Sequence, residues 1–354
     1  MSLSVGLVGL PNAGKSTLFN ALLKRAIAKV AEYPFTTVTP HEGVIDVPDE
    51  RLASLALALK PEKVTPATIK FIDIAGLIKG AHKGEGLGNE FLGHIREVDL
   101  VLHLIRAFDS GVPHPMGEID PKRDYEVVET ELVLKDLETV KKLTVNISQP
   151  MEKKLESLIG KLSLWLNEGK PLRDLLLSPE EKEEVKQFFL LTDKPEICVL
   201  NISEKDLNNT AQVSATAPFC VNPIVICAKL EAELADFGES EGKAYLATYQ
   251  INESGLEKLI KESYKTLDLL TFYTIKGGKE VRAWSIKKGA TALSAAAIVH
   301  TDMAKGFIKA EVINYEDFKK YSSWKAASEA GTIELVGRDY QVAEGDILEI
   351  KFSP

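Results

Sequence analysis

A glycine-rich segment close to the start of the chain constrains the fold most strongly. Residues 9–16 read GLPNAGKS and match the pattern G-x-x-x-x-G-K-[ST]. An apolar run at 3–9 predicts a buried strand before it, and the leucine spacing at 15–25 predicts a helix after it. A glycine-rich turn between a strand and a helix lets backbone N–H groups surround a phosphate at the positive end of the helix. The segment therefore predicts a P-loop that holds a nucleoside triphosphate.

The polar groups of this loop have distinct expected tasks. Lys15 is expected to reach the outer phosphates and to act in catalysis, and Ser16 is expected to ligate Mg²⁺. We expect the bound nucleotide to contact a continuous run of the loop: Asn12, Ala13, Gly14, Lys15, Ser16 and Thr17.

A second motif, FIDIAG, places Asp73 at the end of an apolar strand and Gly76 three residues later. In P-loop proteins an acid at this place holds Mg²⁺, often through water, and the glycine amide senses the γ-phosphate. The stretch after it contains four glycines, which predicts a mobile nucleotide switch. Between the two motifs lies YPFTT, where Thr37, or its neighbour Thr36, is expected to complete the Mg²⁺ shell.

Two further loops are candidates for recognition of the nucleotide base. Asn201 and Glu204 follow an apolar strand at the place where GTP-binding proteins usually carry Asn-Lys-x-Asp. Ile202 replaces the lysine and Glu204 is one methylene longer than aspartate, and both changes weaken the case for guanine. The second loop is similar to the Ser-Ala-Lys loop that closes over the base, and it consists of Cys227, Ala228 and Lys229.

The rest of the chain indicates an α/β fold with two additions. Buried strands alternate with helical patterns, which predicts a parallel sheet covered on both faces; the further strands are expected at 69–73, 100–105, 196–200 and 223–227. Leucine-rich helical spacing over 124–190, with a break at 146–150, predicts an inserted helical hairpin. Residues 268–354 predict a small α+β module that opens with a β-hairpin around Gly277 and Gly278.

Composition indicates where the protein works and what it touches. No apolar run approaches about 18 residues, so no membrane span is expected, and the N-terminus does not resemble a signal peptide. Three cysteines without a CxxC pair are too few for a disulfide framework, which favours a reducing cytoplasm. The net charge is −9, yet one strip near the C-terminus is basic, and it either faces RNA or is a solvated strand pair: Lys276, Lys279, Arg282, Lys287 and Lys288.

Together these motifs resemble the YchF family of P-loop nucleotidases, relatives of the Obg-type GTPases. The similar stretches span nearly the whole chain: GLPNAGKSTLFNAL, YPFTT, DIAGLIKGAHKGEGLGNEFL, NISEKD, KEVRAWSIKKGATA, HTDMAKGFIKAEVINYEDF and YQVAEGDI. The sequence departs modestly from the family at Ala13, where valine is more usual, and in a short helical insert.

The resemblance implies an architecture and a function. A Ras-like nucleotide-binding domain would comprise 1–123 and 191–267, interrupted by the hairpin at 124–190, and 268–354 would form a β-grasp (TGS) domain. The implied activity is hydrolysis of ATP, with GTP tolerated, by a monomeric switch that uses Mg²⁺. The implied partner is the ribosome or ribosomal RNA, contacted through the TGS domain and the hairpin.

The position after D-x-x-G raises the question of what orients the attacking water. Ras-like GTPases carry glutamine there, whereas this chain has Leu77. A histidine could accept a hydrogen bond from the water, and we favour His114, in a Gly/Pro-rich loop beyond the strand at 100–105, over His82. Asn12 is a weaker candidate, which could hold K⁺ near the phosphates.

Three other functions remain open from the sequence. An Obg-type GTPase in ribosome assembly would bind GTP at least as tightly as ATP. A P-loop kinase would pass the γ-phosphate to an acceptor other than water. A scaffold whose P-loop only stabilises the fold would show no turnover that depends on Lys15.

Overall fold

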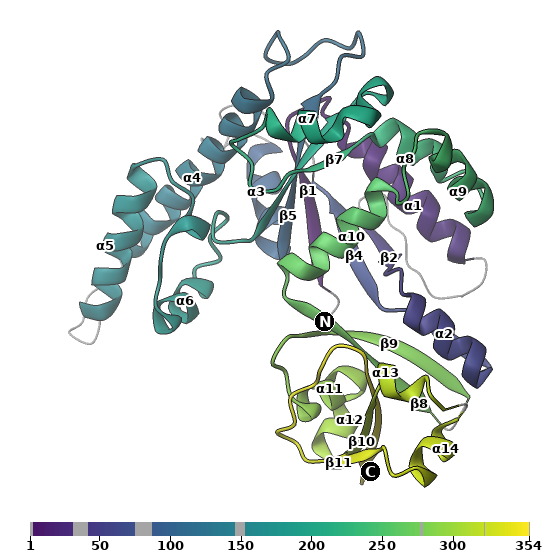
Figure 1. Ribbon diagram of the computed structural model, residues 1–354. Coiled ribbons are helices and arrows are strands. Elements are labelled where there is room, and N and C mark those ends of the chain that lie inside the picture. The colour runs from purple at the N-terminus through teal and green to yellow at the C-terminus, as the bar shows by residue number, and fades with distance from the viewer. Residues whose placement is uncertain are drawn as a thin grey trace. The chain divides into compact units, whose positions relative to one another are not determined.

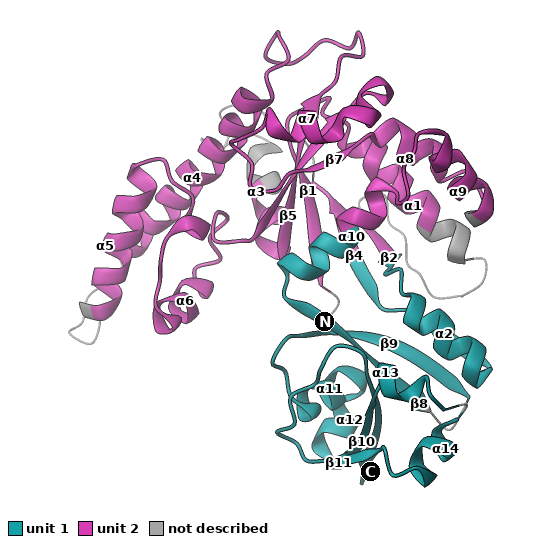
Figure 2. Cartoon of the chain, in the orientation of Figure 1, with its two compact units in different colours: residues 1–2, 45–69, 260–354 teal, residues 3–44, 70–259 magenta. Residues whose placement is uncertain are grey.

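The computed structural model describes residues 3–30, 42–74, 87–145, 153–276, 279–321 and 323–353. Within these ranges no helix is both long and apolar enough to cross a membrane. The chain divides into two compact units, which are coloured in Figure 2: unit 1 comprises residues 1–2, 45–69 and 260–354, and unit 2 comprises residues 3–44 and 70–259.

A six-stranded sheet with the order β2-β4-β1-β5-β6-β7 contains the nucleotide motifs (Figure 1). Its strands are β1 (Ser4–Val8), β2 (Glu42–Asp46), β4 (Thr68–Asp73), β5 (Leu100–Ala107), β6 (Glu196–Ile202) and β7 (Ile224–Ile226). β1 pairs in parallel with β4 and β5, and the pairs β5–β6 and β6–β7 are also parallel. The α/β class expected from the alternating pattern is confirmed, and every residue of β1 is buried.

Helices lie between these strands and also follow the last of them, β7. They are α1 (Lys15–Val30), α3 (Leu87–Glu97), α7 (Thr210–Ala215), α8 (Ala228–Leu234), α9 (Glu239–Thr248) and α10 (Gly255–Thr266). One buried cluster joins Val8 of β1 and Ile74, just after β4, to Leu92 and Ile95 of α3. This packing holds the ends of β1 and β4, and therefore both phosphate motifs, in one place.

The insert after β5 consists of the long helices α4 (Pro121–Val145) and α5 (Lys153–Asn167), then η3 (Leu172–Asp174) and α6 (Pro179–Lys186). α4 and α5 share a core that includes Val140, Leu158 and Leu162 (Figure 1). The expected break at 146–150 lies outside the described residues. α6 begins with a capping box in which Ser178 and Glu181 satisfy each other's backbone N–H groups.

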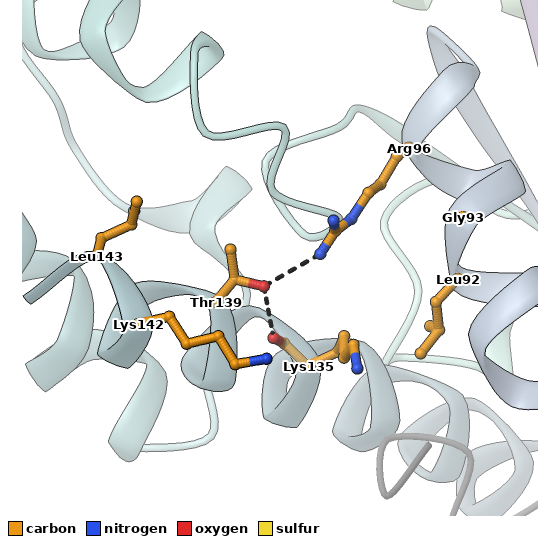
Figure 3. Close-up of a pocket in the computed structure, with 7 residues that line it drawn as sticks. All are labelled: Leu92, Gly93, Arg96, Lys135, Thr139, Lys142 and Leu143. Atoms are coloured by element: carbon orange, nitrogen blue, oxygen red, sulfur yellow. Dashed lines mark hydrogen bonds between the residues drawn. The ribbon is translucent and has the colours of Figure 1, made fainter. Parts of the chain in front are cut away.

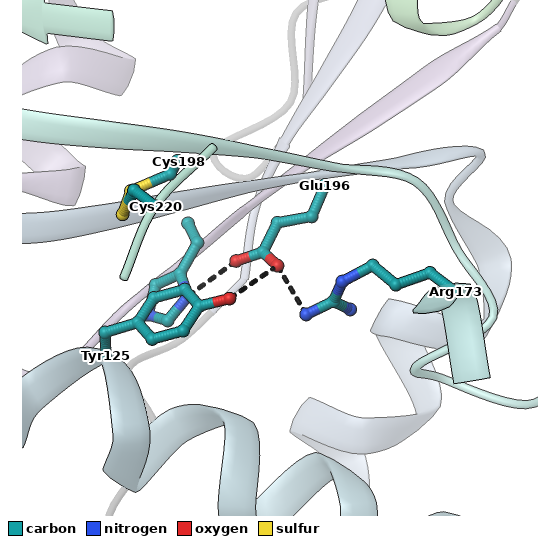
Figure 4. Close-up of a disulfide and its surroundings, with 6 residues drawn as sticks. Tyr125, Arg173, Glu196, Cys198 and Cys220 are labelled. Carbon is teal, nitrogen blue, oxygen red and sulfur yellow. Dashed lines mark hydrogen bonds and ion pairs between the residues drawn. A yellow bond between two sulfur atoms is a disulfide. The ribbon is translucent and has the colours of Figure 1, made fainter. Parts of the chain in front are cut away.

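A buried ionic network joins the insert to the sheet (Figure 4). Arg173 of η3 pairs with Glu129 of α4 and lies 2.5 Å from a carboxylate oxygen of Glu196 on β6. Glu196 also receives hydrogen bonds from His103 at 2.8 Å and from the Tyr125 hydroxyl at 3.4 Å. Burial would raise the pKa of Glu196, but Arg173 and His103 outweigh it and hold that pKa below its usual range.

The same network contains a group with the ligand types of a metal site. One nitrogen or oxygen from each of His103, Glu129 and Glu196 lies within 4.8 Å of the others, and no further group of this kind occurs in the described ranges. The guanidinium of Arg173 already supplies the positive charge between the two carboxylates. We therefore assign the cluster to an ion-pair network that fastens the insert.

A disulfide that the cysteine spacing did not predict links Cys198 of β6 to Cys220, which precedes β7 (Figure 4). The two Cα atoms are 5.9 Å apart, although the residues are 22 apart in sequence. Both cysteines belong to a buried cluster with Ile105 and Leu200, so the parallel sheet brings together two thiols that no local motif marks. Cys227 is the free cysteine and is buried.

We expect reduction of this disulfide to lower the free energy of unfolding of unit 2 by about 3 kcal/mol, because the unfolded chain regains the freedom of a loop of roughly 20 residues. Urea unfolding of a Cys227→Ala protein, with and without a phosphine reductant, measures the effect. A Cys198→Ser/Cys220→Ser protein in the same background is the control and should not respond to the reductant. An unchanged unfolding midpoint on reduction of the disulfide would contradict the prediction.

Unit 1 contains a mixed sheet with the order β11-β10-β12-β8-β9-β3. Its strands are β3 (Lys63–Thr65), β8 (Leu269–Lys276), β9 (Glu280–Lys287), β10 (Phe307–Asn314), β11 (Glu334–Val336) and β12 (Asp346–Phe352), and its helices are α2 (Glu50–Leu59), α11 (Ala292–Val299), α12 (Thr301–Lys305), α13 (Tyr315–Phe318) and α14 (Trp324–Glu329). β8 and β9 pair antiparallel, as the hairpin pattern predicted, while β12 runs parallel to β8. The β-rich C-terminal module is thus present, and its name as a TGS domain remains a prediction.

The structure divides the chain differently from the expected domain boundaries. Residues 45–69 and 260–267, expected in the nucleotide-binding domain, group with the C-terminal module, and the insert groups with unit 2. The physical reason is packing, because Leu52 and Ala67 share a buried core with Tyr273. β3 extends the C-terminal sheet by pairing in parallel with β9.

Candidate nucleotide-binding and catalytic site

Both glycines of the P-loop occupy places that a larger residue would not fit. A Cβ on Gly9 would lie 2.3 Å from the backbone oxygen of Leu104 on β5. Gly14 has φ +98°, and a Cβ there would lie 2.3 Å from the side-chain nitrogen of Asn201. The loop is therefore pressed against the neighbouring strands β5 and β6, and only glycine permits this approach.

Lys15 lies at the start of α1 with its ammonium group turned into the loop. Nζ donates hydrogen bonds to the carbonyl oxygens of Gly9 and Leu10, each at 3.0 Å, and the residue is 7% exposed. Burial lowers the pKa of Lys15 to about 8, although the nearby Asp73 carboxylate opposes this shift. A buried ammonium on the phosphate side of the loop is well suited to neutralise phosphate charge.

Ser16 and Asp73 come together although 57 residues separate them. The Ser16 hydroxyl donates to Oδ2 of Asp73 at 3.4 Å, and Ser16 and Thr17 are exposed in the first turn of α1. A hydroxyl beside a carboxylate offers the hard oxygen ligands that Mg²⁺ prefers, so these two residues fit the ion. The other expected phosphate and metal residues, Thr37 and Gly76, lie outside the described residues, as do Leu77 and His82.

Asn201 connects the P-loop to the second base loop. Its side-chain nitrogen donates to the carbonyl oxygen of Ala13 at 2.9 Å, and its side-chain oxygen accepts from the backbone N–H of Ala228 at 3.0 Å. Asn201 is buried, so both ends of the amide are used inside the protein. The side chain thus links the two loops to each other, a role that the base-contact prediction for Asn201 did not include.

The remaining base-loop residues form an exposed ion pair beside a buried thiol. Lys229 donates to Glu204 at 2.9 Å, and this contact raises the pKa of Lys229. Cys227 is 2% exposed, and burial raises the pKa of its thiol. Ile202 is buried in the same cluster as Cys227, so it lacks both the charge and the exposed stem of the lysine that it replaces. The structure therefore brings together all the predicted base-loop residues at the ends of β6 and β7.

His114 is held away from solvent by two partners. Nε2 lies 2.7 Å from the Asp124 carboxylate on α4, and the backbone N–H of Met116 donates to Nδ1 at 3.1 Å. These partners assign the proton to Nε2, because Nδ1 accepts a hydrogen bond. The side chain is 2% exposed, so neither ring nitrogen is available to water in this conformation.

The loop of His114 nevertheless touches the P-loop. Asn12 has φ 64° in the left-handed region, and its side-chain nitrogen donates to the carbonyl oxygen of Pro113 at 3.2 Å. This contact places the residue next to His114 against the phosphate-binding loop. The same hydrogen bond uses the side-chain nitrogen of Asn12, the residue for which a K⁺ contact was considered.

Arg106 is a supporting residue that the sequence analysis missed. It is the largest fully buried side chain of the described residues and is the last residue but one of β5. Its guanidinium donates to the carbonyl oxygens of Phe108 at 3.1 Å and Val112 at 2.9 Å, and to the Ser110 hydroxyl at 3.2 Å. Arg106 thereby shapes the loop that leads to His114. A lone arginine inside the apolar run LVLHLIRA was the available signal.

Comparison with known proteins identifies the family to which this chain belongs. Residues 4–146 match a family model described as a 50S ribosome-binding GTPase, and residues 269–353 match one named for the C-terminal part of YchF GTPases and described as a protein of unknown function. Proteins named ribosome-binding ATPase YchF are 42% identical in Bacillus subtilis and 41% identical in Haemophilus influenzae, each over 100% of both chains. The chain belongs to the YchF family.

A solved relative agrees with this assignment over the whole fold. The structure of the Schizosaccharomyces pombe YchF GTPase is 35% identical and superposes with a TM-score of 0.88, covering 99% of this chain and 98% of that one. The predicted P-loop nucleotide-binding fold is thereby confirmed, together with the expected membership of the YchF family.

Proposed function

We propose that the protein is a Mg²⁺-dependent ATPase, converting ATP and water to ADP and phosphate, and that it acts as a nucleotide switch associated with the ribosome. The observation that carries this proposal is the convergence of Lys15, Ser16 and Asp73 at the ends of β1 and β4. Ser16, Asp73 and Thr37 would hold Mg²⁺, which would supply positive charge to offset that of the phosphates. The relatives' name, ribosome-binding ATPase, supports the same reading.

The base loops favour adenine over guanine. Guanine recognition needs an aspartate that accepts two hydrogen bonds and a lysine stem along the base. Here Ile202 is buried and Glu204 is paired with Lys229. A pairing lost in this way costs about 1–3 kcal/mol, which corresponds to a factor of about 5 to 150 in affinity.

Titration with fluorescent ATP and GTP analogues tests the proposed function. We expect tighter binding of ATP, and hydrolysis of the bound nucleotide with water as the acceptor. An Ile202→Lys/Glu204→Asp protein, which rebuilds the Asn-Lys-x-Asp sequence, should shift the preference toward GTP. Equal or tighter GTP binding by the unaltered protein would instead favour an Obg-type GTPase in ribosome assembly.

We also propose that His114 positions the attacking water after its loop releases the ring from Asp124. The contact of Asn12 with Pro113 supports this proposal, because it sets the loop beside the P-loop, where the phosphates would bind. In a His114→Ala protein we expect ATP affinity within about twofold of normal and single-turnover hydrolysis slower by 10-fold or more. His94→Ala, which removes an exposed histidine of α3, is the matched control.

An unchanged hydrolysis rate in the His114→Ala protein would exclude this role. His82→Ala is then the next variant to assay, with replacement of K⁺ by Na⁺ as the parallel test of Asn12.

We infer that ribosomal RNA contacts the basic strip of unit 1. Lys279 and Lys287 are exposed at opposite ends of β9, and Lys288 follows directly. Trp284 is not an open stacking surface, because the Arg282 guanidinium lies 3.8 Å from its ring centre and its indole nitrogen donates to Thr274 at 2.9 Å. Phosphate charge is thus the chemistry that this strip can recognise.

We expect a Lys279→Glu/Lys287→Glu/Lys288→Glu protein to co-sediment with ribosomes less than the unaltered protein at low salt. Its binding should fall less steeply as salt increases, because fewer phosphates are neutralised. The control reverses three other exposed lysines of unit 1, Lys319, Lys320 and Lys325. Equal loss in both proteins would show that net charge, and not the strip, decides binding.

The ribosomal role also leads us to propose that the protein is a monomer in the cytoplasm. Reductants in that compartment would open the Cys198–Cys220 disulfide.

A further inference from the structure

A cavity lies between α3 and α4 (Figure 3). Its volume is ≈ 370 Å³, within the range of small-ligand pockets. The lining comes from these two helices alone: Leu92, Gly93, Arg96, Lys135, Thr139, Lys142 and Leu143. None of these residues belongs to the P-loop or to the base loops, so the cavity is separate from the nucleotide site.

Three cationic side chains share this cavity. Lys135, Thr139 and Lys142 are spaced by four and three residues on α4, which places them on one face of the helix. Arg96 reaches the same space from α3 and donates to the Thr139 hydroxyl at 3.1 Å. Glu138 pairs with Lys135 at 3.3 Å, and the buried Asp136 carboxylate acts electrostatically on Arg96. The residues that line the cavity themselves include these three cations and no acid.

Arg96 reaches the cavity with its outer guanidinium nitrogens, one of which donates to Thr139. Its Nε is closed to solvent and has no hydrogen-bond partner among the described residues, so a ligand in the cavity would meet the outer nitrogens instead. A guanidinium is suited to bind the oxygens of a phosphate. Lys142 is exposed at the opposite side of the cavity and forms no ion pair with a described residue. Donors from both helices thus face one space.

Gly93 leaves room for a ligand beside these donors. A Cβ on Gly93 would meet no atom within 4 Å, so the helix surface is open there. Leu92 and Leu143 add apolar wall, which suits the organic part of a phosphate ester. We propose that this pocket binds a phosphate group, supplied either by a small phosphorylated molecule or by an RNA backbone.

Titration calorimetry with tripolyphosphate tests the proposal, with the P-loop saturated by a non-hydrolysable ATP analogue and Mg²⁺. We expect saturable binding that weakens at least 10-fold in Lys142→Glu, which reverses a charge, and in Gly93→Met, which fills the space. Lys154→Glu changes an exposed lysine of α5 outside the cavity and should stay within twofold. Absence of saturable binding, or equal affinity in all four proteins, would overturn the proposal.

A short single-stranded RNA distinguishes the two sources of phosphate. Displacement of tripolyphosphate by the RNA in the unaltered protein, lost in Lys142→Glu, supports the site with RNA backbone as the ligand. Binding of tripolyphosphate that the RNA does not displace supports the site with a small phosphorylated ligand. Thermal unfolding of each variant identifies folding defects, and Lys142→Glu remains decisive if Gly93→Met is unstable because Lys142 is exposed.

Discussion

The Lys15→Met protein is expected to hydrolyse ATP at least about 100-fold more slowly than the unaltered protein, because it lacks the buried cation that faces the transferred phosphate. Loss of a charge-assisted hydrogen bond should also weaken ATP binding by about 10- to 100-fold. Phosphate release after rapid mixing measures the first effect, and nucleotide titration measures the second. Lys24→Met removes an exposed lysine from the same helix and is the matched control.

The pH dependence of the free energy of unfolding shows whether the Lys15→Met protein loses ATP hydrolysis because it lacks the ammonium group or because it misfolds. Burial lowers the pKa of Lys15 to about 8 in the folded protein, whereas the unfolded chain retains a value near 10.5. Between these values the unfolded state binds more protons, so the free energy of unfolding should rise with pH across this window. The nucleotide-free Lys15→Met protein should lack that contribution. Normal turnover in Lys15→Met would contradict the catalytic role and favour a scaffold whose P-loop only stabilises the fold.

The second large effect is expected at Arg173. An Arg173→Leu replacement should lower the free energy of unfolding by about 3–5 kcal/mol, because Glu129 and Glu196 would then be buried without their cation. Urea unfolding followed by tryptophan fluorescence, to which Trp165 of α5 contributes, measures this change. Lys161→Ala breaks a partly exposed pair with Glu181 and should cost less than about 1 kcal/mol.

Lower pH should restore part of the free energy of unfolding that the Arg173→Leu protein loses. Burial and the Glu196 charge already raise the pKa of Glu129, although Arg173 opposes them. Without Arg173 the pKa values of both carboxyls would lie above those of the unfolded chain. The folded state would then bind more protons, so the stability deficit should shrink as the pH falls toward 5. A deficit that does not change with pH would indicate lost packing instead of uncompensated charge.

The sequence marks the proposed phosphate-binding segment clearly because its residues are contiguous. The run from Gly9 to Ser16 needs a turn between a strand and a helix, and the glycines, lysine and hydroxyl each follow from that local geometry. Asp73 was predictable for the same reason, since it ends an apolar strand. The fold class followed from the alternation of strands and helices, which depends on short-range patterns.

Partners far apart in sequence were not predictable in this way. Asn201 bonds to Ala13 across 188 residues, and Cys198 reaches Cys220 because β6 and the segment before β7 pack together. β3 pairs with β9, which is far from it in sequence. It does so because the apolar residues of the segment around β3 pack against Tyr273. No local pattern encodes which of several apolar surfaces a segment will cover.

The loop that carries His114 has some features that the sequence predicts and others that only the tertiary structure determines. Its Gly/Pro-rich composition and its place after β5 marked His114 from the sequence alone, since loops at the carboxyl ends of parallel strands carry ligand-binding residues. The burial of the ring against Asp124, and the support of its loop by Arg106, depend on contacts that the packed chain creates. A local pattern specifies backbone conformation and residue chemistry, whereas burial and hydrogen-bond partners arise only when distant segments exclude water together.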